Sequence, residues 1–480
     1  MRNNYERQGD FEFEALYAVR GDSSFNLLQF ANNLSIYEGV EQKFMTGSLT
    51  FTDANNVLRF YDFKNDVYIV GAFRTPLPDV TKNNIGGFFS RDDIDTRSVF
   101  VLKVTDVSRT KMPTQQGDFV ELTLVSPSMF FDSNKMISRS VGGVGFDPVL
   151  QLMNEFYFDR LNPDRVGLPN FLSDSVFQTG GIRTLDLVDT RYAFLRITKG
   201  SETQTPLRYS FPFMRPSQMI GSAMNDLISE SNDFGYFMWE TLTGFKTATI
   251  QGVQEGTPVI GYSKKYTENR FDESIDERLA SLFTIETMDF PTTGNRMMQT
   301  MSGAFASKMY EFDITTKRLD RRVFDYSIQN PYADAINKFP IQLPEVSQNE
   351  FSGFGNIVSF DVASFNFNTP SGDPDENLYI DDEGHLNMIS QKTLMYDTQL
   401  EITVPGNHII EAGMTVNIDV PPNTISDDLV DEDISGSYLV NALSHNFEFQ
   451  GNTHKMSLGL TRNFRNTPKR AVQYNNMERA

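Results

Sequence analysis

Apolar and polar residues alternate in four segments near the C-terminus: TQLEITV (398–404), MTVNIDV (414–420), YLVNALSHNFEF (438–449) and KMSLGLT (455–461). Successive side chains leave a strand on opposite sides, so a period of two indicates strands with one buried and one solvated face. Turn residues separate the segments at PGN (405–407), PPN (421–423) and GN (451–452). The block Thr398–Arg462 is therefore predicted to be an antiparallel meander, which suits a small closed or nearly closed barrel.

The first 130 residues repeat this pattern. Alternation recurs in FEFEA (11–15), LTFT (49–52), FVLKV (100–104) and VELTL (120–124), and VYIV (67–70) is a short run with higher burial. The turn-rich segment 113–118 joins the last two alternating runs, so these are predicted to form a hairpin. Residues 1–130 are therefore predicted to form a first small β-barrel domain.

The middle of the chain changes to helical periodicity. Asp147 is predicted to be the N-cap of a helix, with Pro148 at the first helical position. Apolar residues follow at helical spacing: Val149, Leu152, Met153 and Phe156. A second helix is predicted to open at Pro216 and end near Ser231, with one apolar stripe: Met219, Ile220, Ala223, Met224, Leu227 and Ile228. A hairpin over 235–250 follows, and its Trp239, the only tryptophan, is expected to pack under this helix.

Alternation returns in YEFDI (310–314) and VFDY (323–326), and these strands are expected to join the C-terminal block. The stretch 328–393 between them is loop-rich and contains the acidic segment Asp373–Glu383. The predicted fold is mainly β with an α+β insertion. Its parts are a first barrel at 1–130, a helix-containing peripheral domain at 131–295, a second barrel at 296–465 with the long loop 328–393, and a flexible tail at 466–480.

The charge and composition exclude several classes of function. The 480-residue chain has 42 Lys and Arg residues against 63 Asp and Glu residues, a net charge of −21. This charge argues against tight binding to nucleic-acid phosphates and against stable docking on anionic lipid. The absence of cysteine excludes disulfides, thiolate catalysis and cysteine-based zinc sites. The N-terminus lacks the apolar run of a signal peptide, and no stretch approaches the roughly 20 apolar residues of a membrane helix.

Three motifs have a structural explanation that we prefer to the functional one. Arg20-Gly21-Asp22 matches an adhesion tripeptide, but Gly-Asp is a common turn pair. Gly142-Gly143-Val144-Gly145 precedes a helix as a phosphate loop does, but it lacks the following Lys-Ser/Thr and the βαβ unit. The acidic run Asp427–Asp433 lacks the glycine and the alternating spacing of a calcium loop, so we interpret it as a solvated loop.

The chain has four histidines: His385, His408, His445 and His454. His445 and His454 can face each other across the last hairpin, but two histidines alone make a poor metal site. Among the 63 acidic residues, no pair stands in a recognisable context for glycoside hydrolysis. We therefore assign no catalytic, cofactor-binding or metal-ligating residue, and we expect no cofactor.

Four blocks, taken in order, carry a resemblance to a known family. They are the hairpin end LTLVSP (122–127) with KMISR (135–139); the helix 219–229 with GYFMWET (235–241); SGAFASKMYEFDI (302–314) with FDY (324–326); and VPGN (404–407), IEAGMTV (410–416), GSYLV (436–440) and His445. In this order, the blocks resemble the baseplate hub proteins of contractile-tailed bacteriophages. The acidic stretches 373–383 and 427–433 have no match in that pattern.

The resemblance implies a structural virion protein and not an enzyme. It implies two tube-type β-barrels related by a pseudo-repeat, so that a homotrimer presents six barrels around one axis. Such a ring joins the six-fold tail tube to the three-fold central spike and forms part of the ejection channel. The implied partners are the central spike protein, the tail tube protein, baseplate wedge proteins and the tape measure protein. DNA would meet the protein only in transit through the lumen, in a baseplate assembled in the host cytoplasm.

Two alternatives remain open. One is a tail-associated carbohydrate-active protein, such as a cell-wall hydrolase. The other is the hub part of a secretion-system spike, which shares the fold, although no spike repeat follows residue 465.

Overall fold

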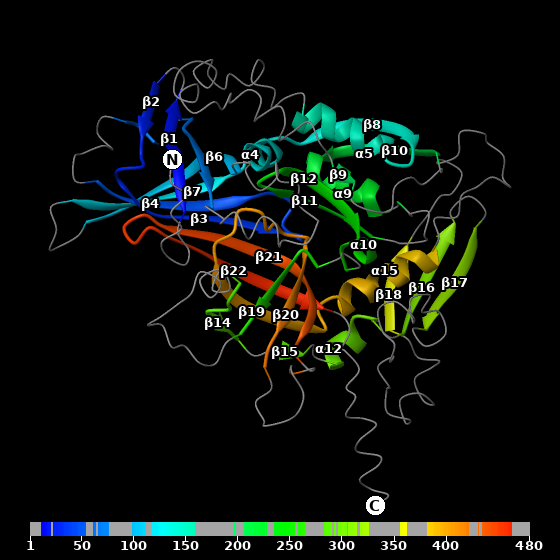
Figure 1. Cartoon of the computed structure of the whole chain (residues 1–480). Helices are drawn as coiled ribbons and strands as arrows, with labels where there is room; N and C mark the ends of the chain where they lie inside the picture. Colours follow the sequence, from blue (N-terminus) through cyan, green and yellow to red (C-terminus); the bar gives the residue numbers. More distant parts are fainter. Residues whose placement is uncertain are drawn as a thin grey trace, which may run out of the picture.

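The structure is a computed structural model of the whole chain (Figure 1). It describes residues 11–20, 23–53, 61–63, 66–75, 98–111, 117–158, 196–197, 206–225, 227, 235–254, 258–264, 283–289, 292–293, 296–304, 306–313, 317–325, 356–361, 382–421, 431 and 434–462. Among these residues, no helix is both long enough and apolar enough to cross a membrane.

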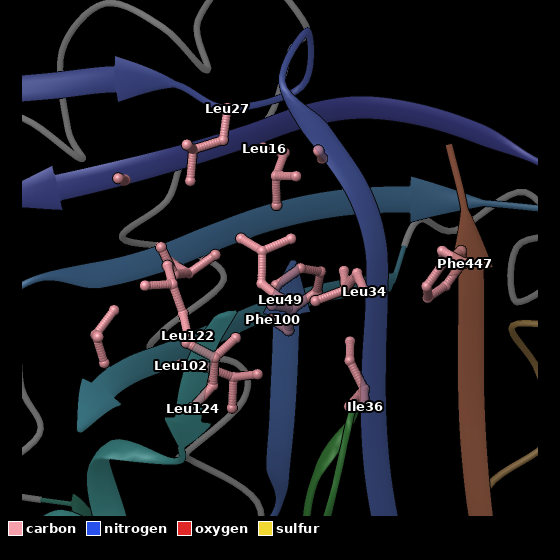
Figure 2. Packing of buried hydrophobic residues seen from close by; sticks show 14 of the residues in the cluster. Leu16, Leu27, Leu34, Ile36, Leu49, Phe100, Leu102, Leu122, Leu124 and Phe447 are labelled. Atoms are coloured by element: carbon pink, nitrogen blue, oxygen red, sulfur yellow. The ribbon is translucent and has the colours of Figure 1, made fainter. Parts of the chain in front are cut away.

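The N-terminal strands form one curled antiparallel sheet, the first barrel. They are β1 (Glu12–Arg20), β2 (Ser23–Asn26), β3 (Ala31–Gly39), β4 (Thr46–Asp53), β5 (Tyr68–Arg74), β6 (Ser98–Lys111) and β7 (Asp118–Val125), in the spatial order β3-β4-β7-β6-β5-β1-β2. Leu16 of β1 and Leu34 of β3 are fully buried in one core, although several strands separate them along the sheet. The sheet therefore wraps around that core, which is the packing shown in Figure 2.

The C-terminal strands form the second barrel. They are β13 (Ile260–Ser263), β14 (Thr287–Met288), β15 (Thr292–Thr293), β19 (Thr398–Pro405), β20 (Thr415–Asp419), β21 (Gly436–Glu448) and β22 (Thr453–Arg462). Their pairing runs β13-β20-β21-β22-β19, and β14 and β15 both pair with β19. A bridge between Ser263 and Thr284 and a hydrogen bond from Glu286 N to Thr403 O (2.9 Å) connect β13 back to β19. This circuit of hydrogen bonds closes the barrel.

The two barrels repeat one topology. The first runs β1-β5-β6-β7-β4-β3 and the second runs β13-β20-β21-β22-β19, ending in β14 and β15. Numbered by their order in the chain, with β2 left out and β14 and β15 counted as one, the strands follow the same spatial order, 1-4-5-6-3-2, in both barrels. One difference is that β13 pairs with β20 in parallel, whereas β1 and β5 are antiparallel. The predicted fold class, mainly β with two barrels related by a pseudo-repeat and a helix-containing part, is confirmed.

The middle of the chain contains helices and two small sheets. Its elements are α4 (Pro127–Asn134), β8 (Ile137–Val144), α5 (Asp147–Met153), a π-helical turn (Asn154–Phe158), β9 (Arg196–Ile197), β10 (Pro206–Met214), α9 (Pro216–Asn225), β11 (Tyr236–Thr241), β12 (Gly244–Thr249) and α10 (Ile250–Gln254). Both predicted helices are present. The residue before α5 is Phe146, so Asp147 is the first helical residue and not the cap. The predicted end of the second helix, near Ser231, lies outside the described residues.

The strands near residue 310 do not join the C-terminal block. β16 (Ala306–Asp313) pairs with β17 (Arg318–Asp325) and β18 (Asn356–Asp361) in a separate sheet. The second barrel instead takes β13, β14 and β15 from the region before residue 295. Amphipathic alternation predicts that a segment is a strand but does not specify its partner, which explains the wrong assignment. The predicted domain boundaries at 130, 295 and 465 stay predictions.

The stretch 328–393 is not one long loop. It contains β18 and the helix α15 (Asp382–Leu394). A shorter helix, α12 (Arg296–Met301), lies before this stretch, ahead of β16. Leu386 and Leu394 of α15 are buried. The acidic composition concealed this helix, because the same residues fit a solvated loop.

Candidate functional site: the seam between the two barrels

One strand belongs to both barrels. Along β21, Gly436–Leu439 pairs with β20 of the second barrel, and Ala442–Glu448 pairs with Gly39–Asn33 of β3 in the first barrel. A bulge between Val440 and Ala442 separates the two parts, and the carbonyl of Asn441 accepts a hydrogen bond from Val40 N (2.9 Å). We call the paired segments Asn33–Gly39 and Ala442–Glu448 the seam. It makes the two barrels one continuous sheet, as the blue β3 beside the red β21 in Figure 1 shows.

The seam carries a side chain of the second barrel into the core of the first. Phe447 of β21 is 1% exposed and belongs to the same cluster as Leu34 (Figure 2). Its ring centroid lies 4.7 Å from that of Phe73 and 5.3 Å from that of Phe11, in edge-to-face arrangements. Aromatic pairs of this geometry stabilise a core beyond their buried area. The first barrel therefore has no complete core without the second.

Two buried histidines lie behind Phe447. His445 Nδ1 and His454 Nε2 are 3.1 Å apart, and both side chains are completely buried. The His454 ring stacks on Phe447 with centroids 4.1 Å apart. Burial lowers the pKa of His445 to about 3, and the nearby His408 adds to this. Burial likewise holds the pKa of His454 well below its usual value, so both rings are neutral near pH 7.

The histidines face each other as the sequence suggested. Among the described residues, no group of three or more His, Asp or Glu side chains could hold a metal ion. His445 and His454 form a hydrogen-bonded pair within an aromatic cluster.

The loop after β19 docks the second barrel on the strand ends of the first. Thr75 N donates to His408 Nδ1 and His408 N donates to Thr75 Oγ1, both at 3.2 Å. Ser98 Oγ donates to His408 O at 3.3 Å. Gly406 N donates to His454 O (2.8 Å), and a Cβ at this glycine would overlap the His454 ring. The Pro-Gly-Asn turn predicted at 405–407 thus needs glycine for close approach.

The β11–β12 hairpin joins the same junction from the middle of the chain. Trp239 is 2% exposed, and its Nε1 donates to Ala412 O of the second barrel at 2.9 Å. The expectation that Trp239 packs under the helix is wrong, because Tyr236 and Met238, on the other face of β11, contact α9 instead. Opposite parities of one strand face opposite sides, and Trp239 faces the barrels.

Buried charges connect the three parts. Glu38 of β3 accepts hydrogen bonds from Leu242 N (2.8 Å) and Ala412 N (3.3 Å). Glu240 of β11 accepts from Met45 N at 3.2 Å, which ties the hairpin to the first barrel. Each carboxylate holds backbone N–H groups of another part, so the junction is fixed by charge-assisted hydrogen bonds.

An ion pair completes the junction. Lys246 of β12 contacts Glu411 of the second barrel, and the two side chains are 9% and 3% exposed. Because breaking a buried pair leaves a charge without compensation, this contact resists separation of the hairpin from the second barrel.

Glu38 and Glu240 were not among the candidate residues predicted from the sequence. Glu38 and Glu240 are 2% and 0% exposed. Glu38 follows Leu34 and Ile36 on the buried parity of β3, and Glu240 follows Tyr236 and Met238 in β11, where all six residues are buried. A glutamate in register with apolar residues is the signal that could have identified both.

The described parts of the motifs weighed in the sequence belong to elements outside the seam. Arg20 pairs with Ser23 across the β1–β2 hairpin, as a turn requires, while Gly21 and Asp22 are outside the described residues. Gly142 and Gly143 lie in β8, and Gly145 has φ +57° just before α5, which supports a structural role for these glycines. Most of the acidic stretches 373–383 and 427–433 also lies outside the described residues.

No family model matches this sequence, and no curated protein matches it either. Solved structures do. The tail protein from Neisseria meningitidis MC58 is similar with a TM-score of 0.50 and 10% identity, over 94% of this chain and 97% of that one. The 43 kDa tail protein of prophage MuSo2 from Shewanella oneidensis has a TM-score of 0.48 and 9% identity, over 94% and 98% of the two chains.

The fold is similar to that of the Neisseria tail protein. Because the Neisseria protein is similar over nearly the whole of both chains, the likeness includes both barrels and the middle of the chain. The resemblance found in the sequence is confirmed at the level of the fold.

Proposed function

We propose that this chain is a structural component of a phage baseplate: a homotrimeric hub ring between a six-fold tail tube and a three-fold spike. The repeat of one strand topology in a single chain carries the proposal. Three copies of a two-barrel chain present six similar units around a three-fold axis, which is what a symmetry adaptor needs.

The seam supports a load-carrying role. Main-chain pairing through β3 and β21 and the shared aromatic core prevent one barrel from rotating against the other, and the buried ion pair fixes the β11–β12 hairpin to the second barrel. A ring that transmits force between tube and spike needs such a fixed angle. The predicted division at 130, 295 and 465 forms part of this proposal, with the middle region bracing the ring from outside.

The acidic composition supports a channel function. With a net charge of −21, a lumen lined by these barrels would repel DNA phosphates during ejection and would not trap them. The proposed partners are the central spike, the tail tube, wedge proteins and the tape measure protein, in a virion assembled in the host cytoplasm. We propose no catalytic activity, no cofactor and no stable membrane binding.

Mass photometry of the purified chain tests the proposal. We expect particles of three chains and no clearance of purified peptidoglycan. A stable monomer that hydrolyses peptidoglycan would refute the hub role and favour the cell-wall hydrolase.

A further inference from the structure

The pseudo-repeat pairs each strand of the first barrel with a counterpart in the second, and β6 corresponds to β21. Both strands contain a bulge at the same place, between Val104 and Asp106 in β6 and between Val440 and Ala442 in β21. Just before the bulge, Val104 N donates to Val67 O (2.9 Å), as Val440 N donates to Met414 O (2.8 Å). The two strands therefore correspond residue by residue.

After the bulge, the two strands differ in one respect. In β21, Ala442–Glu448 pairs with β22 on one edge and with β3 on the other. In β6, Asp106–Lys111 pairs with β7, and within the described part of the chain no strand pairs with its other edge. All of its side chains except half-buried Val107 are exposed. We call Asp106–Lys111 the free edge. An open strand edge is a template for another chain.

The counterpart of β3 is also open. β14 and β15 pair with β19 on one edge, as β3 pairs with β4. On the opposite edge, Thr284 forms a bridge with Ser263, and beyond this bridge no described strand pairs with β14 or β15. Residues 286, 287 and 289 are exposed. We call Thr287–Asp289 the acceptor edge. Each chain thus has one paired seam and two unpaired halves of a second one.

We infer that the free edge of one copy of this chain pairs with the acceptor edge of a neighbouring copy, as β21 pairs with β3 inside each chain. This inference rests on the proposed ring function, and it specifies the surface that closes the ring. The two halves lie on different surfaces of one chain, so the contact is heterologous, and repeating it generates a ring or a filament.

The internal seam sets the register of the contact. Ser35 lies opposite Asn446, and the two side chains form a hydrogen bond of 2.9 Å. Counting from the bulges, Asn446 corresponds to Thr110. In the first barrel Ser35 lies opposite Ser48 of β4, and the counterpart of Ser48 in β19 is Glu401. Asp289 N donates to Glu401 O, so Asp289 is the counterpart of Ser35. Thr110 of one copy is therefore placed opposite Asp289 of the next.

Charge favours the same register. The free edge contains Arg109 and Lys111, and the acceptor edge contains Asp289 and follows Glu286. Within the chain, Arg109 pairs with Asp118 and Glu286 pairs with Lys455 at 2.6 Å, so both ion pairs border the proposed contact. The register places Lys111 opposite Met288 and diagonal to Glu286, within reach of a long side chain. Lys111 occupies, in the inferred contact between copies, the position that Phe447 occupies in the internal seam. A charged free edge keeps the single chain soluble until a matching edge arrives.

Disulfide trapping tests the pairing, because the native chain has no cysteine that could interfere. The full-length variant carries Thr110→Cys and Asp289→Cys, both at exposed positions. After mild oxidation, we expect covalent species of two and three chains on a non-reducing denaturing gel. The two single variants mixed in equal amounts should give covalent dimers only. Each single variant alone, and the control pair Thr110→Cys with Lys135→Cys, should remain uncrosslinked.

The possible outcomes separate this inference from the proposed function. Cross-linking of the designed pair and not of the control pair supports the inferred contact. If the wild-type chain forms trimers by mass photometry but the designed pair does not cross-link, the pairing is wrong and the ring stands. If the wild-type chain remains monomeric, both are wrong.

Discussion

Acidification should weaken the seam through its two buried histidines. His445 and His454 are neutral and share one hydrogen bond inside an aromatic cluster. Protonating both rings would place two positive charges in a cavity where the facing titratable group is His408, which cannot compensate them. Unfolding exposes the histidines to water, where they protonate at their ordinary pKa.

The sign and size follow from the difference between the folded and unfolded pKa values. The folded pKa of His445 is about 3 against an ordinary value of 6.5, so the unfolded chain binds more protons between these two pH values. The stabilisation is complete above pH 6.5 and is lost as the pH falls toward 3. Each pKa unit corresponds to about 1.4 kcal/mol, so His445 alone should lower the free energy of unfolding by about 2 kcal/mol at pH 5. His454 acts in the same direction.

The fluorescence of Trp239 provides the assay. This single tryptophan lies at the junction and donates to Ala412 of the second barrel, so its emission reports separation of the parts. Urea titrations at several pH values between 5 and 7.5 should be compared for the wild type and for H445Q/H454Q. The control is H385Q, which changes a histidine of α15.

The double variant should lose its stability less steeply than the wild type as the pH falls, by at least about 2 kcal/mol between pH 6.5 and 5. H385Q should follow the wild type. Parallel pH profiles for the wild type and the double variant would show that the histidines are not buried and neutral, and the reasoning would be refuted.

Three further perturbations test the junction. Lys246→Met leaves Glu411 buried without its partner and should cost about 3–5 kcal/mol in urea unfolding, whereas adding Glu411→Met should recover most of this. If the single and double variants are equally unstable, the pair is not a coupled unit. Gly406→Ala forces a Cβ against the His454 ring and should cost about 1–3 kcal/mol by thermal unfolding, and less in a His454→Ala background. Equal costs in both backgrounds would contradict the close approach. Trp239→Phe removes the donor to Ala412 O and should cost about 1–3 kcal/mol, measured by circular dichroism in urea.

The sequence predicted the strands that are long and have one wet face. β19 and β22 alternate over most of their length, β21 alternates after its bulge, and α9 keeps an apolar stripe. In these elements the pattern records a surface that is buried on one side only, so local sequence is sufficient. The same reasoning found the β6–β7 hairpin.

The sequence could not predict which strands close the second barrel. β13 has four residues, and β14 and β15 have two each, too few for a period to be recognised. Their partners, β19 and β20, lie more than a hundred residues further along the chain. Closure depends on long-range pairing, about which alternation contains no information. The strands near residue 310 have a clearer alternating pattern, so the sequence favours them, incorrectly, as members of the second barrel in place of β13, β14 and β15.

The pairing of β3 with β21 at the seam could not be predicted from the sequence for a different physical reason. The β21 segment shows one apolar parity in Leu439, Leu443 and Phe447, but Leu443 packs in the second barrel and Phe447 in the first. The bulge near Asn441 turns the strand from one partner to the other. Because a single strand completes both sheets, neither barrel can change its orientation without breaking main-chain hydrogen bonds in the other. The angle between the barrels is then fixed before any assembly. To close a ring, each copy would need to form only one further contact, the inferred pairing of its free edge with the acceptor edge of the next copy. That contact is a polar counterpart of the seam inside each chain.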